Sequence, residues 1–212
     1  MDSIKIHIIN SSGSLDDIEN VINSAFQKAS AQAVGDFNLD KVDVLFIDDP
    51  RSVIPELGVS GYSPSGSLIY IYLDSSANPK EEDIYATLLH EFHHSKRWRD
   101  PGYGETLWET LVTEGLACVY GEQITGSRPI YVANKDNPLE LLDALKLDDS
   151  NYNHFEIFIT GNKHLPRWFG YFAGYEIAKF LLENKNIDSI EAVNKKFKLD
   201  QKKLSGQLQQ TA

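Results

Sequence analysis

One helical segment limits the folds open to this chain more than any other part of the sequence. Between Asn78 and Arg99, apolar residues recur three and four positions apart and form a single stripe: Ile84, Tyr85, Leu88, Leu89 and Phe92. Asn78, Pro79 and Glu81 match a helix start, with an asparagine cap, a proline in the first turn and a glutamate three residues after the cap. The sequence therefore predicts a long amphipathic helix that ends before Pro101.

Other periodic segments lie on both sides of this helix. Short apolar, β-rich runs predict strands at Ile4–Ile9, Val42–Ile47 and Leu68–Leu73. Helical spacing predicts further helices at Leu15–Ala33 after a Ser14 cap, at Glu105–Tyr120 and at Pro166–Glu183. The stretch 51–66 is rich in glycine and proline, which indicates a loop or a short hairpin. We expect one α+β domain over residues 1–212, with an α/β lobe over about 1–100 and a mostly helical lobe over about 101–212.

Composition excludes several classes of protein. The 212 residues are 42% hydrophobic, which is enough for one sizeable core. The formal net charge of −11 repels phosphate groups, so we expect neither nucleic-acid binding nor attachment to anionic membranes. Cys118 is the single cysteine, so no intrachain disulfide can form. The N-terminal segment is not typical of a secretory signal peptide and no apolar run reaches membrane-spanning length, so we expect a cytoplasmic protein of open oligomeric state.

A metal-binding motif lies within the long helix. His90-Glu91-Phe92-His93-His94 matches H-E-x-x-H. His90 and His94 are one helical turn apart, about 40° around the axis, so both imidazoles can reach one zinc ion. Glu91 lies beside them, where its carboxylate can activate a water molecule and take its proton. His90 and His94 point away from the apolar stripe, either toward a cleft or, in the alternative interpretation, toward bulk water as a solvated face. His93 lies on the far side of His90 from Glu91, and we expect it to be exposed or to support the site.

A catalytic zinc site needs a third protein ligand, and the next helix offers two glutamates. Its inner side is marked by Leu107, Trp108, Leu111, Cys118 and Val119. Glu114 lies at the edge of this apolar side, about 60° around the helix axis from Leu111, whereas Glu109 lies about 160° from Leu111. A carboxylate at the margin of a buried face needs a partner, so we favour Glu114 as the ligand and interpret Glu109 as a solvent-exposed charge.

Asp100 is the third candidate ligand. Compact zinc sites of the H-E-x-x-H-x-x-G-x-x-H/D type use a glycine to turn the chain back, and Arg97 occupies that position here. Arginine resists the positive φ of such a turn, and Asp100 before Pro101 is more simply the end of the helix.

These motifs resemble those of known zinc proteases. His90 to His94, with Glu114 twenty positions after His94, is similar to the gluzincin arrangement, in which thermolysin-like enzymes take a glutamate ligand from a later helix. The sequence resembles more closely a mainly bacterial family of predicted zinc-dependent proteases. It shares their H-E-x-H-H signature, an E-G-L-A signature at 114–117 and a G-Y-x-x-G-Y segment at 170–175, over roughly Leu73 to Leu182.

The resemblance implies a zincin-like fold and a zinc peptidase in which His90, His94 and Glu114 bind Zn²⁺ and Glu91 activates water. It also implies that the strand Leu68–Leu73 runs along the cleft and binds an extended peptide substrate. Gly115 beside the glutamate would let the two zinc-binding helices approach closely. Where thermolysin has an acidic residue four positions after its glutamate ligand, this chain has Cys118.

Two tyrosines could assist the chemistry. Tyr171 and Tyr175 lie one turn apart on the last long helix, and either could donate a hydrogen bond to the developing oxyanion. Alternatively, both are core aromatics with satisfied hydroxyls.

Two other functions remain possible from the sequence. One is a zinc hydrolase that acts on a non-peptide amide. The other is a non-catalytic module in which zinc only ties two helices together, although such a site has no use for Glu91 and usually closes with four protein ligands.

Overall fold

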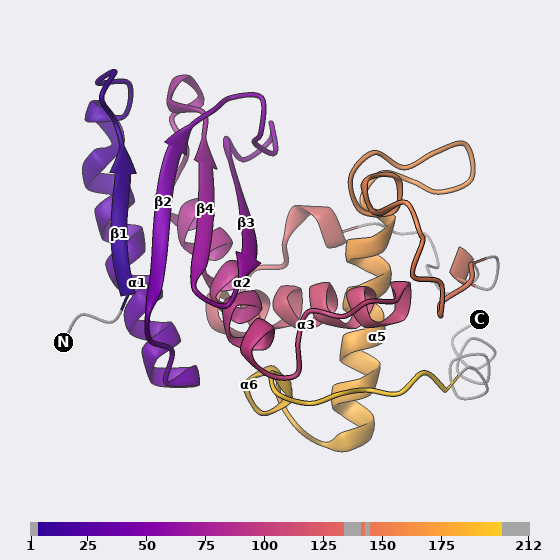
Figure 1. The fold of residues 1–212 in the computed structure, drawn as a ribbon. Coiled ribbons are helices and arrows are strands. Elements are labelled where there is room, and N and C mark those ends of the chain that lie inside the picture. The colour runs from indigo at the N-terminus through magenta and orange to yellow at the C-terminus, as the bar shows by residue number, and fades with distance from the viewer. Residues whose placement is uncertain (1–3, 134–140, 143–144, 201–212) are drawn as a thin grey trace. The chain divides into compact units, whose positions relative to one another are not determined.

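The computed structural model describes residues 4–133, 141–142 and 145–200 of the chain (Figure 1). Strands and helices are both present, which confirms the predicted α+β class. The chain divides into two compact units, Met1–Asp100 and Pro101–Ala212, and each is described here by itself.

The first unit is built on a four-stranded mixed sheet. Its strands are β1 (Ile4–Ile9), β2 (Val42–Asp48), β3 (Val59–Ser65) and β4 (Leu68–Leu73). Their order is β1-β2-β4-β3, with β1, β2 and β4 mutually parallel and β3 antiparallel to β4. A parallel pair needs a crossover connection, and the helix between β1 and β2 provides it.

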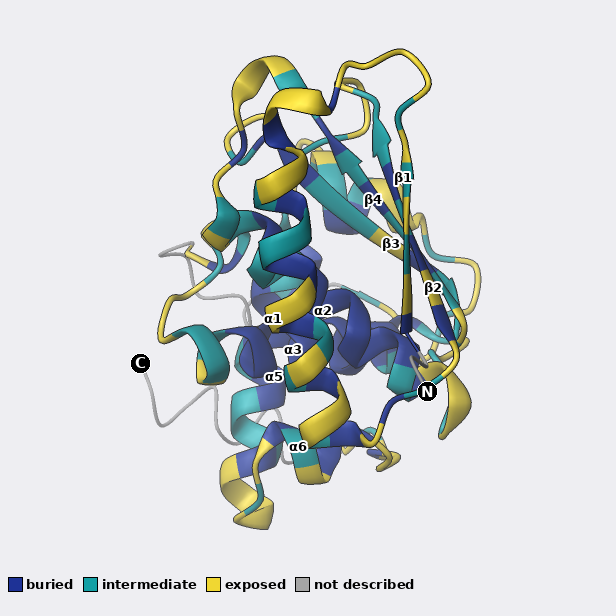
Figure 2. Cartoon of the chain, turned by 90° about the vertical axis from the view of Figure 1, so that its left-hand side faces the viewer, coloured by how far each residue is buried: buried dark blue, intermediate teal, exposed yellow. Residues whose placement is uncertain are grey.

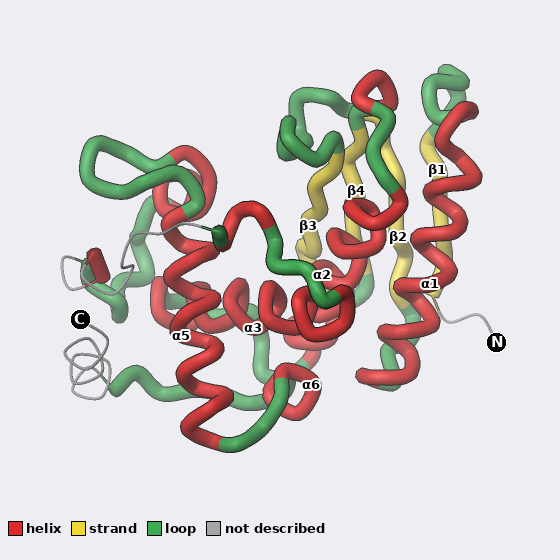
Figure 3. The backbone as a smooth tube through the Cα atoms, turned by 180° about the vertical axis from the view of Figure 1, so that it is seen from behind, coloured by secondary structure: helices red, strands yellow, loops and turns green. Residues whose placement is uncertain are grey.

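Two long helices cover one face of this sheet: α1 (Glu19–Phe37) and α2 (Glu81–Arg99), as Figures 1 and 3 show from opposite sides. Alternate residues along the strands are buried, among them Val44, Phe46, Ile69 and Ile71. The same side of each strand therefore faces the helices, as the two-residue period of a strand requires. The outward side of α1 is exposed, visible as yellow bands in Figure 2.

Strand β3 lies in the stretch expected as a loop or a short hairpin, and it pairs with β4 through the turn near residue 66. This pairing changes the expected role of the strand Leu68–Leu73. As β4, that strand is bonded on both sides, by β2 and by β3, so its backbone cannot take up an extended peptide. The sheet edge beside it belongs to β3.

The helix starts differ from the sequence prediction. Asn78 does not cap α2; it has a positive φ of 50° and ends a short 3-10 turn, η2 (Ser75–Ala77), while Lys80 is the capping position of α2. Ser14 does not cap α1 either, because a 3-10 turn, η1 (Asp16–Ile18), precedes that helix. In both places a turn of tighter helix comes first, and a cap signal in the sequence does not distinguish the two kinds of turn.

The second unit is mainly helical. Its long helices are α3 (Leu107–Thr125) and α5 (Phe169–Lys185), with the short α6 (Ser189–Ala192), a 3-10 turn η3 (Ile130–Val132) and a π-helical turn η4 (Glu156–Thr160). Among the described residues, no helix has both the length and the apolar character that a membrane span needs.

Helices α3 and α5 meet backbone to backbone. A Cβ atom added at Gly115 would lie 1.9 Å from the carbonyl oxygen of Gly174, and one added at Gly174 would lie 2.3 Å from that of Leu111. Gly115 therefore permits the close approach of α3 to α5. The sequence alone instead suggests that Gly115 lets its helix approach the helix that carries His90 and His94.

Candidate metal centre

The histidines of the motif lie on α2 with their side chains together. The Nε2 atoms of His90 and His94 are 2.9 Å apart, and the ring centroids are 4.5 Å apart. His90 is 7% exposed and His94 is 4% exposed. This burial excludes the alternative of a solvated histidine face. Converging imidazole nitrogens one turn apart are suited to bind one metal ion.

Glu91, the second residue of the motif, is also buried, with 5% of its surface exposed. Ser63 on β3 lies beside it, and the serine Oγ is 2.8 Å from Oε2 of Glu91. A buried carboxylate is costly unless hydrogen-bond donors surround it, and Ser63 supplies one. The hydrogen bond from Ser63 thus fixes the carboxylate of Glu91, the residue that directly follows His90 in the sequence.

His93 is fully buried, so the expectation of an exposed or supporting position is corrected in its first half. Its ring meets that of Phe37 of α1 edge-on, with centroids 5.8 Å apart. It also lies 6.4 Å from the ring of His94. His93 therefore contributes to the packing of α1 against α2 and contacts one of the paired histidines.

In the second unit, Glu114 lies on α3 and is 4% exposed. The hydroxyl of Tyr103 donates a hydrogen bond to Oε1 of Glu114. Burial raises the pKa of the Tyr152 hydroxyl; a hydrogen bond with Thr110 opposes this, and the negative charge of Glu114 adds to it. Glu114 is thus a buried carboxylate that bonds to the hydroxyl of Tyr103 and acts electrostatically on that of Tyr152.

The loop before α3 is shaped to hold Tyr103. Its neighbours Gly102 and Gly104 have φ values of +100° and +117°, a region that glycine adopts without strain. A side chain at Gly104 would also collide with Glu109, at 2.5 Å from its Cβ. Thr113 of α3 fixes the loop from the other side, because its Oγ1 donates to the carbonyl oxygen of Tyr103 at 2.6 Å.

His90, His94 and Glu114 form a group of buried side chains whose possible ligand atoms all lie within 4.8 Å of one another. Two atoms bound at about 2.0–2.1 Å to one tetrahedral zinc ion lie about 3.4 Å apart, so the spacing fits a shared ion. Two imidazoles and one carboxylate are also the donor set of a catalytic zinc site. The residues present therefore fit zinc.

Glu109 and Asp100, the two less favoured ligand candidates, lie elsewhere in the structure. Glu109 does not extend freely into solvent: its Oε2 accepts hydrogen bonds from the backbone N–H groups of Glu105 and Thr106, at 2.8 and 3.2 Å. Together with Thr106 it forms a capping box at the start of α3. Asp100 is exposed at the C-terminal end of α2 in an extended backbone conformation. Neither belongs to the group of possible metal ligands.

The two tyrosines of α5 differ in their surroundings. Tyr175 is 1% exposed, its hydroxyl donates to Glu122, and the guanidinium of Arg128 lies 4.9 Å from its ring centre. Burial raises the pKa of Tyr175, and the hydrogen bond to Glu122 raises it further. Glu122 follows Glu114 by two helical turns, a distance of about 12 Å along the axis.

Tyr171, one turn earlier on α5, is half-buried. Its ring packs at 4.9 Å from that of Tyr131 and at 5.5 Å from that of Phe158. No catalytic role for either tyrosine follows from these contacts, so both assignments stay predictions.

Cys118 stands one turn after Glu114 and is completely buried. Burial raises the pKa of its thiol well above the usual value, and the charges of Glu114 and Glu122 raise it further. The thiol therefore stays protonated and fills space as a small apolar group.

Sequence reasoning missed Ser63, Gly61 and Tyr103. The first two lie in the turn-rich stretch that hid β3, and nothing in the sequence links them to Glu91. Tyr103 carried a weak signal, because Gly102-Tyr103-Gly104 directly precedes the helix that bears Glu114. Two glycines indicate a turn in which the backbone takes positive φ values.

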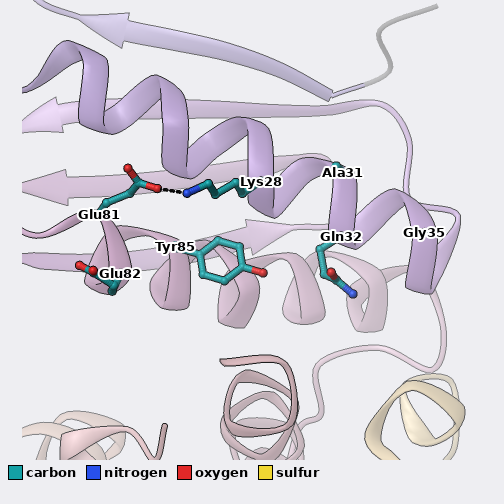
Figure 4. A pocket seen from close by; sticks show the side chains of 7 residues that line it. All are labelled: Lys28, Ala31, Gln32, Gly35, Glu81, Glu82 and Tyr85. Carbon is teal, nitrogen blue, oxygen red and sulfur yellow. Dashed lines mark hydrogen bonds and ion pairs between the residues drawn. The ribbon is translucent and has the colours of Figure 1, made fainter. Parts of the chain in front are cut away.

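A separate hollow of about 480 Å³ in the second unit is lined by Tyr175 and Glu122. In the first unit, a hollow of about 610 Å³ lies between α1 and α2 (Figure 4). There the ammonium group of Lys28 forms an ion pair with Glu81, and Tyr85 lies beside them. None of the proposed metal ligands lines either hollow.

Fold and site together define a class of protein. An α+β chain with a buried His/His/Glu group, and with a glutamate next to the first histidine, is a protein with a possible metal site of the zinc type. The chain belongs to the family described as predicted Zn-dependent proteases (DUF2268), whose sequence profile matches residues 19–199. Comparison with curated proteins and with solved structures gives no match.

Proposed function

We propose that the protein is a zinc-dependent peptidase of the gluzincin type, in which His90, His94 and Glu114 hold Zn²⁺. The observation that carries this proposal is the buried group of these three side chains, together with the buried carboxylate of Glu91. The family description supports the coarser part of the proposal, a zinc-dependent protease. When bound there, zinc would supply Lewis-acid chemistry, polarising the scissile carbonyl and acidifying water.

In this proposal Glu91 is the general base. Its carboxylate accepts the proton of the attacking water and delivers it to the nitrogen of the leaving amine. A site that only ties helices together would not need such a group and would usually close with a fourth protein ligand. Glu91 therefore favours a catalytic over a structural role for the metal.

The substrate would be a peptide in extended conformation. Strand β3 forms the edge of the sheet and carries Gly61 and Ser63, which contact Glu91. A sheet edge offers backbone N–H and C=O groups that can pair with an extended peptide. We propose β3, in place of β4, as the strand that binds the substrate.

For the oxyanion we propose Tyr171 as the better of the two candidate donors. Tyr175 is 1% exposed and so hidden from a substrate, whereas Tyr171 is half-buried and partly accessible. Replacing Tyr171 by Phe should lower kcat by about 10²–10³-fold if it is the donor.

The experiment that tests the function measures zinc content and peptide hydrolysis together. Glu114→Ala should lose zinc and activity, and Glu91→Gln should keep stoichiometric zinc but lose activity. Glu122→Ala is the matched control, since Glu122 is also a carboxylate of α3 that accepts a bond from a tyrosine hydroxyl. It should keep both zinc and activity.

Three outcomes would contradict the proposal in different ways. Zinc retained by Glu114→Ala would show that Glu114 is not a zinc ligand, and this would contradict the gluzincin type. Zinc bound by an inactive wild-type protein would favour the structural module. Hydrolysis of small amides without hydrolysis of a casein or peptide library would favour the zinc hydrolase of a non-peptide amide.

A further inference from the structure

The side chain of Glu91 lies against strand β3, between two residues of that strand. Ser63 places its Oγ 2.8 Å from Oε2 of Glu91 and 3.0 Å from the backbone carbonyl oxygen of the same residue. Gly61, two positions earlier, faces the same side of the strand. A Cβ atom at Gly61 would lie 2.4 Å from Cγ and 2.6 Å from Oε1 of Glu91.

Ser63 is held in place independently of Glu91. It is 4% exposed, and its carbonyl oxygen accepts a hydrogen bond from Nε1 of Trp98 at 2.7 Å. Near the end of the same strand, the carbonyl oxygen of Gly66 accepts one from Oγ of Ser95 at 2.9 Å. Two side chains of α2 therefore fix the backbone of the β3–β4 hairpin, and the serine hydroxyl meets Glu91 in a preset position.

The hydroxyl of Ser63 has one hydrogen and two acceptors within reach. The contact with Oε2 of Glu91 is the shorter of the two, at 2.8 Å against 3.0 Å, so the hydrogen is directed to the carboxylate. Oε1 lies beside Gly61, where a Cβ atom would approach it to 2.6 Å. Ser63 therefore bonds to one oxygen of the Glu91 carboxylate, and Gly61 leaves room for the other.

We propose that Ser63 is a positioning residue for Glu91: its hydrogen bond fixes the conformation of the carboxylate that acts as the general base. Gly61 completes the arrangement, because any side chain at that position would displace Glu91. This inference rests on the proposed function, in which Glu91 is the general base. Ser63 itself does not touch the reacting atoms.

The test compares Ser63→Ala, Ser63→Thr and the control Ser67→Ala in the zinc-loaded protein. Ser67 lies in the turn between β3 and β4, and its hydroxyl is 3.5 Å from that of Ser65. Ser63→Ala should lower kcat by about 10- to 100-fold, because a general base that can rotate is often misplaced. KM and zinc content should stay within about twofold of wild type, and Ser63→Thr, which keeps the hydroxyl, should recover most of the lost kcat. Unchanged kcat in Ser63→Ala would overturn the inference, as would an equal loss in Ser67→Ala.

A second measurement does not depend on activity. In the metal-free protein, the urea midpoints of unfolding are compared for Ser63→Ala, Glu91→Ala and the double variant. A bonded pair predicts that the double variant shifts the midpoint by less than the sum of the two single shifts. Additive shifts would show that the two side chains are not coupled and would overturn the inference even if the Ser63→Thr variant failed to fold.

The two measurements separate failure of the inference from failure of the function. Turnover by the wild-type protein with additive midpoints and a fully active Ser63→Ala contradicts only the role of Ser63. Coupled midpoints in the metal-free protein, combined with no peptide hydrolysis by the zinc-loaded protein, contradict the proposed function, and the positioning role of Ser63 with it.

Discussion

Two glutamates on the same helix, Glu109 and Glu114, have different tasks because their surroundings differ. Glu109 satisfies backbone N–H groups that the first turn of α3 leaves without helical partners. Glu114, five positions later, is buried and accepts a bond from a tyrosine hydroxyl. The angular positions of the two glutamates around the helix predicted that their surroundings differ. The capping role of Glu109 is indicated only by the sequence T-x-x-E at 106–109, which a helical-wheel argument does not take into account.

The capping role of Glu109 gives a pH-dependent prediction. The hydrogen bond from the backbone of Glu105 holds the pKa of Glu109 below its usual value, with desolvation opposing and Thr106 assisting. A depressed folded-state pKa means that the stabilisation is complete above the ordinary carboxyl pKa of about 4.3 and is lost as the pH falls through the folded value. Glu109→Ala should therefore cost about 1 kcal/mol of unfolding free energy at pH 7.

Urea unfolding at pH 7 and in acid measures this effect. The difference between wild type and Glu109→Ala should shrink in acid, where the wild-type carboxyl is protonated. A difference that is constant with pH would show that the charge of Glu109 does not contribute to the cap.

Tyr103 gives a second prediction about a single residue. Its hydroxyl bonds to Glu114, so Tyr103→Phe should weaken zinc binding by about 10- to 100-fold, as loss of a partner of a metal ligand usually does. Tyr175→Phe is the matched control, because that hydroxyl bonds to Glu122 on the same helix. Competition titration with a zinc chelator gives both affinities, and equal affinities in the two variants would contradict the role of Tyr103.

The approach of His90 to His94 could be predicted because the two residues are close in sequence, whereas the contacts of Glu91 could not. His90, Glu91 and His94 depend only on helical spacing. Ser63 and Glu91 are brought together by a strand that pairs across a turn and docks on a helix, which is tertiary structure. Periodicity carries no information about such contacts.

Among the elements, strand β3 shows why the sheet was only partly predicted. Strands β2 and β4 are rich in apolar, β-forming residues with alternate positions buried, and this composition is visible in the sequence. The edge strand β3 reads VSGYSPS, and glycine, serine and proline indicate a turn when the pairing partner is not known. An edge strand tolerates these residues because one of its sides needs no ladder partner.

Replacement of glycine by alanine should have opposite effects at Gly115 and at Gly35, because only Gly115 lies at the contact between α3 and α5. Gly115→Ala would push a methyl group against backbone atoms of Gly174, which cannot rotate away, so it should cost about 3 kcal/mol or more. Gly35→Ala in α1 meets nothing within 4 Å and should stabilise by about 0.5–1 kcal/mol.

Chemical denaturation of the two variants checks both signs. The comparison controls for helix propensity, since each change puts alanine within a helix. A neutral Gly115→Ala would show that α3 and α5 can separate without loss of stability.

For the whole molecule, the proposed site predicts that zinc raises the thermal stability. A ligand that binds only the folded chain stabilises it by RT ln(1 + [L]/Kd), which is about 4 kcal/mol at a thousandfold excess over Kd. The melting temperature should therefore rise when zinc is added to metal-free protein and fall again with a chelator. Scanning calorimetry measures the shift.

The variants His94→Ala and Glu114→Ala identify the ligands responsible. Each should remove most of the zinc-dependent rise in melting temperature, while Glu109→Ala should leave it unchanged. A rise of wild-type size in Glu114→Ala would mean that zinc binds through other residues.

The sheet combines one hairpin, β3–β4, with two parallel strand pairs, and this difference should set the order in which the strands form during folding. In the hairpin, Tyr62 pairs with Tyr70 across a short turn, whereas Ile6 pairs with Val44 only after all of α1 has been traversed. Closing a short loop costs less chain entropy than closing a long one, so β3 and β4 should associate first. The strand that carries Gly61 and Ser63 would then be formed before β1 joins the sheet, and pulsed hydrogen exchange should find its amides protected earlier than those of β1. Simultaneous protection would instead indicate that the sheet nucleates as one unit.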